Sequence, residues 1–150
     1  MRAVVQRVSR AAATIGGETV GSIGPGLLAL VGIRRGDDDA AGRWLCDKLL
    51  RLRVFEDGEG KMNRTVAEAG GGILLVSQFT LYGDVRKGNR PGFDEAAPPE
   101  EAEPLYDRMV AYLREVSPVP VATGRFRAEM AVELVNDGPV TILLDSRKLF

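Results

Sequence analysis

The first part of the chain combines β-forming and polar residues in a pattern that predicts a long strand. Residues 1–15 contain the β-formers Val4, Val5, Val8, Thr14 and Ile15, with polar residues placed between them. Gly-Gly and Gly-Pro-Gly are turn sequences, so 16–17 and 24–26 predict turns into strands over 18–23 and 27–33. This segment is therefore expected to form strands joined by hairpin connections.

Two segments change to a helical period of apolar residues. The first begins at the acidic triplet 37–39 and continues with Ala41, Leu45, Leu49 and Leu52. The second begins at Pro98-Pro99, has Pro104 near its first turn or at a bend, and continues with Leu105, Met109, Tyr112, Leu113 and Val116. We interpret 37–39 as a helix cap rather than a cation site, because consecutive helical residues point in different directions.

The rest of the chain predicts short strands and one long loop. Apolar runs indicate strands at Val54-Phe55, 73–76, 130–135 and 140–144, with a turn at 136–139 between the last two. Residues 85–99 have no regular period and are expected to form an ordered loop. Because hairpin connections dominate, the sequence predicts a single mixed α/β domain over 1–150. Its expected core is a largely antiparallel, β-barrel-like sheet with two packed helices.

Composition and charge narrow the range of partners. Hydrophobic residues make up 45% of the chain and charged residues 27%, as in globular domains. The formal charge of -1 argues against binding nucleic acid through bulk charge, so no DNA partner is expected. Arg2, Gln6 and Arg7 interrupt any signal-peptide core, and the best apolar run, 27–33, is too short to cross a membrane. We therefore expect a cytoplasmic protein without membrane contact.

The lack of histidine restricts the possible chemistry. With no histidine and one cysteine, Cys46, the chain cannot form a Ser-His-Asp triad, a Cys-His pair or a zinc site of imidazoles or paired thiolates. One cysteine cannot form an intrachain disulfide, which fits a reducing compartment. We interpret Cys46 as a small residue that flanks the core, and we expect no metal and no cofactor.

Two polar segments beside predicted strands are candidates for a functional site. Ser77-Gln78-Phe79-Thr80-Leu81 follows the strand 73–76, and a strand end that turns sharply exposes N–H groups that can hold an oxyanion. Asn136-Asp137-Gly138-Pro139-Val140-Thr141 has turn chemistry, and its proline, lacking an N–H, leaves nearby carbonyls free. Taken alone, the first segment is better explained as a sheet edge and the second as a hairpin turn.

Taken together, the two segments resemble the SQxTL and NxGPxT signatures of D-aminoacyl-tRNA deacylases. Other segments look like sequence of the same family: Gln6-Arg7-Val8, Leu52–Asn63, Tyr82-Gly83-Asp84, Ala96-Ala97-Pro98-Pro99 and the C-terminal Leu-Leu-Asp-Ser. The resemblance covers nearly the whole chain. It implies a cytoplasmic homodimer of mixed β-barrel-like fold that edits aminoacyl-tRNA without a cofactor. The reaction is hydrolysis of the ester that links tRNA to a D-amino acid, or to glycine mischarged on tRNA(Ala).

The resemblance also assigns a role to the second segment. It implies that Gly138 and Pro139 form a Gly-cis-Pro element that one subunit inserts into the active site of the other. The carbonyls of this element would occupy the space that an L side chain needs. Arg7 has two open interpretations: it holds this turn in place, or it is a strand residue in a surface salt bridge.

Catalysis is assigned to Ser77, Gln78, Phe79 and Thr80. Backbone amides around Gln78–Thr80 are expected to stabilise the oxyanion. We favour attack by water, assisted by the 2′-hydroxyl of the substrate, with Thr80 orienting groups. The rival mechanism makes Thr80 a nucleophile, although the sequence identifies no base or metal to activate it.

Contacts with tRNA are assigned to two further groups of residues. Phe126 and Met130 look like family positions that line the pocket for the terminal adenosine, although such residues near a strand are usually core. Arg86, Lys87 and Arg90 form a basic cluster suited to phosphates of the acceptor stem, or simply a solvated loop.

Arg127 departs from the family pattern, which leads us to expect glycine after Phe126. This change affects details of the tRNA contact. Two other functions stay open. One is a related deacylase of mischarged L-alanyl-tRNA with a trans Gly-Pro, whose pattern differs at 77–81. The other is a non-catalytic module that binds the tRNA end, which turnover at catalytic enzyme concentrations would separate from an enzyme.

Overall fold

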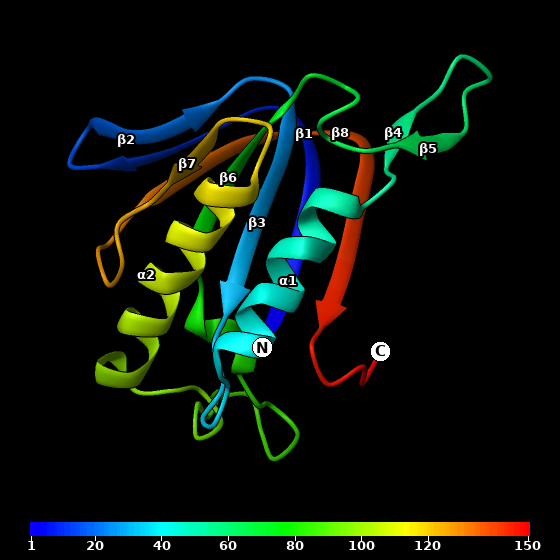
Figure 1. The fold of residues 1–150 in the computed structure, drawn as a ribbon. Helices are drawn as coiled ribbons and strands as arrows, with labels where there is room; N and C mark the ends of the chain where they lie inside the picture. Colours follow the sequence, from blue (N-terminus) through cyan, green and yellow to red (C-terminus); the bar gives the residue numbers. More distant parts are fainter.

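β1 organises the fold because it pairs with three other strands. The computed structural model describes all 150 residues, and Figure 1 shows a curved sheet with both helices on one of its faces. The elements are β1 (Arg2–Ile15), β2 (Glu18–Ile23), β3 (Gly26–Gly32), α1 (Asp39–Arg51), β4 (Phe55–Glu56), β5 (Met62–Arg64), β6 (Gly72–Ser77), the short 3-10 helix η1 (Phe79–Tyr82), α2 (Pro99–Val116), β7 (Val121–Thr123) and β8 (Ala131–Asp145).

The main strands form one mixed, nearly closed sheet. β1 pairs antiparallel with β3 along its first half, with β2 along its second half and with β8 on its other edge. β3 continues the sheet through parallel pairs with β6 and then β7. β2 lies against β7, where a Cβ on Gly21 would collide with the carbonyl of Thr123, so only glycine allows this approach. The predicted mixed, β-barrel-like fold is confirmed, although the β3–β6–β7 part is parallel.

The two strands predicted near the C-terminus are a single strand, so the prediction of a hairpin turn at 136–139 is wrong. Both parts of β8 pair with β1, with Val135 opposite Arg10 and Thr141 opposite Gln6. Asn136 is opposite Val8, so the five steps from Asn136 to Thr141 correspond to only two steps along β1, from Val8 to Gln6. The extra residues bulge out of the strand. Residues 136–141 are called the β8 bend below; Figure 1 places it in the upper right.

Both helices form where the apolar period predicts them. The Asp38 side chain caps α1 by accepting a hydrogen bond from the Ala41 N–H at 2.9 Å, which confirms the capping role of the acidic triplet. α2 begins at Pro99, and Pro104 lies inside it without ending it. No helix of the structure is both long enough and apolar enough to span a membrane.

The core lies between the helices and the sheet. α1 and α2 approach closely at Gly42, where an added Cβ would lie 2.7 Å from Cγ of Met109. Cys46 is fully buried in this layer, and burial raises the pKa of its thiol to about 12. Large side chains buried in the same cluster include Leu27, Leu45, Leu49, Ile73, Leu75, Leu105 and Leu113. The second face of β6 packs on a smaller cluster that includes residues of β8.

Candidate active site

The site is built at the end of the buried strand β6. The last ladder contact there is the Gln78 N–H, which donates to the Val31 carbonyl at 2.7 Å. The chain then turns into η1, which packs on the end of β3, where an added Cβ on Gly32 would lie 3.0 Å from Cβ of Leu81. The core thus fixes the position of the segment 77–81, and a short helical turn replaces the predicted simple strand end.

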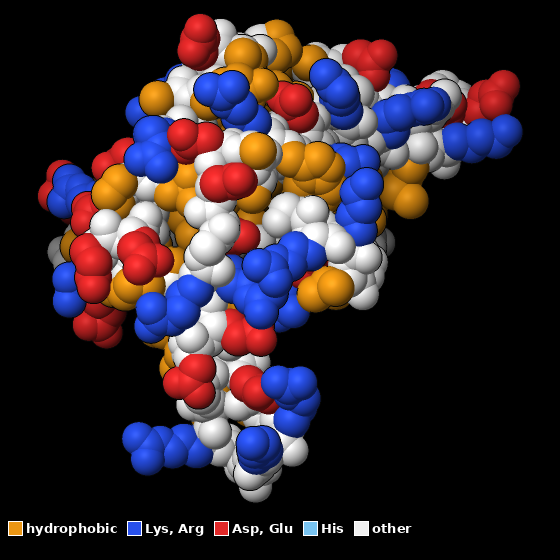
Figure 2. Space-filling view, turned by 60° about the horizontal axis from the view of Figure 1, so that its bottom comes forward, with side chains coloured by type: hydrophobic (Ala, Val, Ile, Leu, Met, Phe, Trp, Pro, Cys, Tyr) orange, Lys and Arg blue, Asp and Glu red, His pale blue; other side chains and the backbone are white.

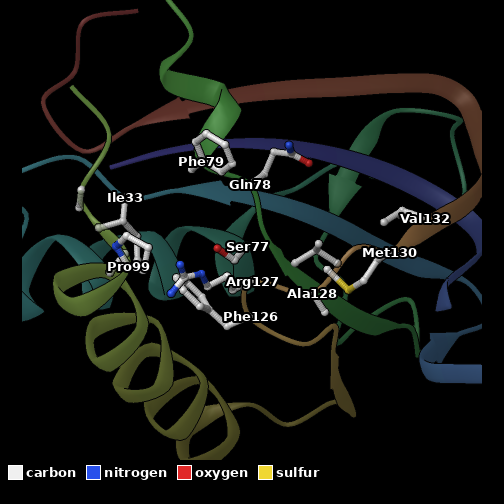
Figure 3. A pocket seen from close by; sticks show the side chains of 13 residues that line it. Ile33, Ser77, Gln78, Phe79, Pro99, Phe126, Arg127, Ala128, Met130 and Val132 are labelled. Carbon is white, nitrogen blue, oxygen red and sulfur yellow. The ribbon is translucent and has the colours of Figure 1, made fainter. Parts of the chain in front are cut away.

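A cavity of about 420 Å³ opens beside this turn. Five of the predicted site residues line it: Ser77, Gln78, Phe79, Phe126 and Met130. Figure 3 shows their side chains converging from β6, η1 and the segment after β7. The rest of the wall is Ile33, Val76, Ala97, Pro99, Ala102, Arg127, Ala128 and Val132. Residues separated by more than fifty positions in the sequence therefore share one mainly apolar cavity.

The far wall is held against β6 by specific contacts. The ring of Phe126 packs on Tyr106 of α2 with centroids 5.8 Å apart, and the Tyr106 hydroxyl donates to the Leu75 carbonyl at 2.9 Å. Burial raises the pKa of Tyr106, so its hydroxyl stays protonated as a donor. The sulfur of Met130 lies so close to Gly124 that an added Cβ there would be 2.7 Å from it. Contacts with Tyr106 and Gly124 thus fix the positions of the Phe126 ring and the Met130 thioether.

The polar groups near the cavity are few. Thr80 is exposed beside the cavity rather than in its lining, and its hydroxyl accepts a hydrogen bond from the Gln78 side-chain amide. At the two ends of η1, the Leu81 N–H donates to the Gln78 carbonyl and the Gly83 N–H donates to the Thr80 carbonyl. The first N–H groups of a helical turn have no acceptor within it, so those of Phe79 and Thr80 are available to a ligand. No three residues among Asp, Glu, Cys and His are grouped so that they could hold a metal ion.

The β8 bend is stiffened by its own polar groups. The Asn136 side chain accepts from the Val140 N–H at 3.0 Å and donates to the Thr141 hydroxyl at 3.1 Å. The Gly138-Pro139 peptide bond is cis, and Gly138 has a φ of 132°. Only glycine fits there, because a Cβ would lie 2.8 Å from Cγ2 of Val140.

Arg7 lies beneath this bend. It is 7% exposed, and its guanidinium donates from Nε to the Asp137 carbonyl at 3.0 Å and from Nη1 to the Val54 carbonyl at 2.7 Å. The Asp137 carboxylate is 3.8 Å away. The side chain of Arg7 therefore lies against the turn, and the carboxylate it approaches belongs to Asp137 of the same bend.

The β6 end of the cavity, at Ser77 and η1, and the β8 bend lie apart in the sheet, although Val132 of β8 also lines the cavity. Ser77 is opposite Val31, which is opposite Ala3 of β1, whereas Asn136 is opposite Val8. Five residues of strand span roughly 17 Å, and the two segments also lie on different sides of β1. Figure 1 shows the same separation between η1 and the bend. Within one chain, the two predicted parts of the site are not brought together.

The basic cluster lies on the loop between η1 and α2, outside the cavity. Paired hydrogen bonds between the backbones of Asp84 and Gly92, at 2.8 and 2.9 Å, close this loop. The Asp84 carboxylate pairs with the Arg86 guanidinium, which lowers the pKa of that carboxyl. Lys87 and Arg90 are exposed. In Figure 2, basic side chains on this side of the molecule are interspersed with acidic ones.

Sequence reasoning did not include all residues of the cavity. Pro99 and Arg127 line it, but neither was a predicted site residue. The signal for Pro99 is its place in the Ala-Ala-Pro-Pro segment that looks like family sequence. The signal for Arg127 is its departure from the glycine expected after Phe126, but its place in the lining depends on a left-handed backbone conformation with φ of 63°.

Comparisons with known proteins identify the family of this chain. A family model described as D-Tyr-tRNA(Tyr) deacylase matches residues 4–145. A protein of Symbiobacterium thermophilum named D-aminoacyl-tRNA deacylase is 65% identical over 150 residues, covering 100% of this chain and 99% of the relative. A protein of the same name from Anaeromyxobacter dehalogenans is 62% identical, with 100% of both chains covered.

Two solved structures share the fold. One, titled c-Myc DNA Unwinding Element Binding Protein, is 44% identical with a TM-score of 0.90, covering 97% of this chain and 98% of that chain. The other, titled as a probable eukaryotic D-amino acid tRNA deacylase, is 21% identical with a TM-score of 0.79, covering 95% and 97%. Since the family model and these full-length relatives all match, the chain belongs to the D-Tyr-tRNA(Tyr) deacylase family.

Proposed function

We propose that the chain hydrolyses the ester between a D-amino acid and the terminal ribose of tRNA. The observation that carries the proposal is the cavity, whose walls combine Ser77, Gln78 and Phe79 with Phe126 and Met130. A mainly apolar cavity of about 420 Å³ is of the size that holds a small ligand such as a nucleoside. Phe126 and Met130 would contact the terminal adenosine, which places the ester near η1.

The chemistry proposed at η1 is positioning plus oxyanion stabilisation. Water, assisted by the 2′-hydroxyl of the ribose, adds to the ester carbonyl, whose oxygen becomes an oxyanion held by the N–H groups of Phe79 and Thr80. The attacking water gives up one proton through the 2′-hydroxyl, and collapse of the intermediate breaks the ester bond while that proton passes to the leaving ribose oxygen. Thr80 acts by orienting groups, because its only side-chain partner is the Gln78 amide, which cannot act as a base.

Selection against L-amino acids is assigned to Gly138 and Pro139 of a second copy. The β8 bend is roughly 17 Å along the sheet from the level of Ser77 in its own chain, which is too far for it to act at η1. β8 pairs only with β1 and has exposed apolar side chains, Val135 and Leu143, near both ends. An uncovered strand edge with apolar residues favours association. In the homodimer the carbonyls of the bend exclude an L side chain, whereas glycine passes.

The first test measures deacylation of D-tyrosyl-tRNA, L-tyrosyl-tRNA and glycyl-tRNA with EDTA present. We expect loss of the D-tyrosyl and glycyl esters while the L-tyrosyl ester is spared. No turnover would leave a non-catalytic module that binds the tRNA end. Equal loss of the D and L forms would keep the hydrolase but contradict exclusion by the bend, and preferential loss of L-alanyl-tRNA would indicate the related L-alanyl deacylase.

A second test asks whether the bend acts between subunits. Phe79→Pro removes one oxyanion donor at a position where a helical turn tolerates proline, and Phe79→Ala is its control for loss of the ring. Gly138→Ala disturbs the bend. We expect Phe79→Pro to lose at least about a hundredfold more kcat than Phe79→Ala, and Gly138→Ala to hydrolyse L-tyrosyl-tRNA as well.

Refolding Gly138→Ala together with an excess of Phe79→Pro then separates the two arrangements. If the bend works across subunits, each surviving active cavity faces an intact bend, so selectivity for the D form returns although the added protein is inactive. If the bend worked within its own chain, the mixture would remain as unselective as Gly138→Ala alone.

A further inference from the structure

Arg127 is the charged side chain in an otherwise neutral cavity wall. The other lining residues are apolar or, as with Ser77 and Gln78, uncharged. Figure 3 shows the guanidinium of Arg127 beside Phe126, on the side of the cavity toward Pro99. An arginine at this position brings five N–H donors and a fixed positive charge to the place where the substrate is expected to bind.

The protein does not use this charge for its own structure. Arg127 takes part in none of the ion pairs or side-chain hydrogen bonds of the fold. Its neighbour Ala128 closes a tight turn by donating to the Arg125 carbonyl at 3.3 Å, and this turn holds Arg127 at φ of 63°. A residue with a side chain adopts this conformation at a cost, and such residues gather at ligand sites.

The substrate supplies one group that matches an unpaired guanidinium. If the terminal nucleoside fills the cavity beside Phe126, the phosphodiester on its 5′ oxygen lies one sugar away, at the mouth. Arginine binds phosphate oxygens through two parallel N–H donors. The other charged group near the cavity would be the ammonium of the amino acid, which repels arginine and belongs at the η1 end.

We propose that Arg127 binds the phosphate that joins the last two nucleotides of tRNA, an inference that rests on the proposed function. It is a substrate-binding residue and takes no part in the bond-breaking step. The loop cations Arg86, Lys87 and Arg90 lie outside the cavity, so they serve phosphates farther along the strand. Arg127 then sets how much of the binding free energy comes from the nucleotide end.

The test compares two substrates that differ in this phosphate: D-tyrosyl-tRNA and 3′-O-D-tyrosyl-adenosine, which has none. Arg127→Gly removes the charge and suits the left-handed backbone, so the fold is retained. We expect KM for D-tyrosyl-tRNA to rise about tenfold or more, with kcat and the rate on the adenosine ester changed less than about twofold. Arg127→Lys should lie between wild type and Arg127→Gly on the tRNA substrate.

Two further measurements separate this contact from general charge. Arg125→Ala removes the same charge from an exposed position two residues away, outside the cavity, and should leave both substrates nearly unchanged. The slope of log kcat/KM against log salt should become shallower by about 0.7 in Arg127→Gly, as for one phosphate of a single strand. Equal losses on both substrates, or none on tRNA, would overturn the assignment of Arg127. A wild-type protein that cleaves neither substrate would instead overturn the proposed function beneath it.

Discussion

The cavity and the β8 bend differ in shape and in the forces that hold them. The cavity is concave, and its walls are placed by apolar packing such as that of Phe126 on Tyr106. The bend bulges from its strand and is held by hydrogen bonds: Asn136 donates to the Thr141 hydroxyl, and the buried Arg7 donates to the Asp137 carbonyl. Flexible side chains can move to new packing positions at a small cost in free energy. Loss of a buried charged donor costs more, because it leaves carbonyls without a hydrogen-bond partner. Substitutions in the bend should therefore lower stability and selectivity for D over L substrates, whereas substitutions in the cavity wall should mainly raise KM.

The largest effect is expected in the bend. Arg7→Ala leaves the carbonyls of Val54 and Asp137 without their donor, so we expect the free energy of unfolding to fall by about 3 kcal/mol. Selectivity for D- over L-tyrosyl-tRNA should collapse with it. Urea unfolding at fixed protein concentration measures the first quantity, and the ratio of the two kcat/KM values measures the second.

Arg10→Ala is the matched control on the same strand. Arg10 pairs with Glu133 at 3.0 Å, but both side chains are exposed, so the expected change in unfolding free energy is within about 0.5 kcal/mol. If Arg7→Ala were as stable as Arg10→Ala, the bend would not depend on the buried guanidinium, and the contrast between the two regions would disappear.

An intermediate effect is expected in the cavity wall. The Cβ added by Gly124→Ala meets the sulfur of Met130, a flexible side chain that can move at a cost below about 1 kcal/mol in stability. Because Met130 then intrudes on the cavity, KM for D-tyrosyl-tRNA should rise about tenfold, or about 1.4 kcal/mol. The ratio between D and L substrates should not change.

Gly58→Ala provides the comparison for this substitution, since a Cβ there meets nothing within 4 Å. Its kinetics should match those of the wild type. The contrary result would be a Gly124→Ala protein that loses selectivity for D over L substrates while keeping its KM. That result would show that the cavity wall itself discriminates between D- and L-aminoacyl esters, which is the role assigned to the bend.

The smallest effect is expected at Thr80, which lies between solvent and the cavity. Thr80→Ala should lower kcat by less than about tenfold, and Thr80→Ser should lie within about twofold of wild type, because the hydroxyl only orients groups. Single-turnover deacylation of D-tyrosyl-tRNA measures both. A loss of more than about a thousandfold in Thr80→Ala, rescued in Thr80→Ser, would indicate a nucleophile instead.

The helices could be predicted because their signals are local. Asp38 caps α1 through a contact three residues away, and the apolar period marks the buried face of each helix. The hairpin expected at 136–139 was wrong for the opposite reason. Asn, Asp, Gly and Pro give the same turn signal in a hairpin and in a bulged strand. What decides between them is the pairing of β8 with β1, more than 120 positions away.

Some residues of the site could be predicted from resemblance to the family, whereas others depend on the folded backbone. Phe126 and Met130 are ordinary core-type residues in the pattern, and only resemblance to the family marked them as lining a cavity with Ser77. The sequence marks Arg127 as a departure from the family pattern but does not predict that it lines the cavity. Its side-chain direction follows from the positive φ of its backbone. Periodicity does not encode such an angle, whereas the folded backbone does.

The length of β1 limits where insertions and deletions can be accepted in proteins of this family. β1 fixes the spacing between the end that faces the cavity and the end that supports the bend. Two residues inserted between Ala3 and Val8 would keep each side chain on its face but lengthen that spacing by about 7 Å. In the proposed homodimer, the bend of each copy would then miss the η1 end of the other copy's cavity. Insertions and deletions should therefore be accepted at the tip of the β4–β5 hairpin or in 85–92, but not within this one strand.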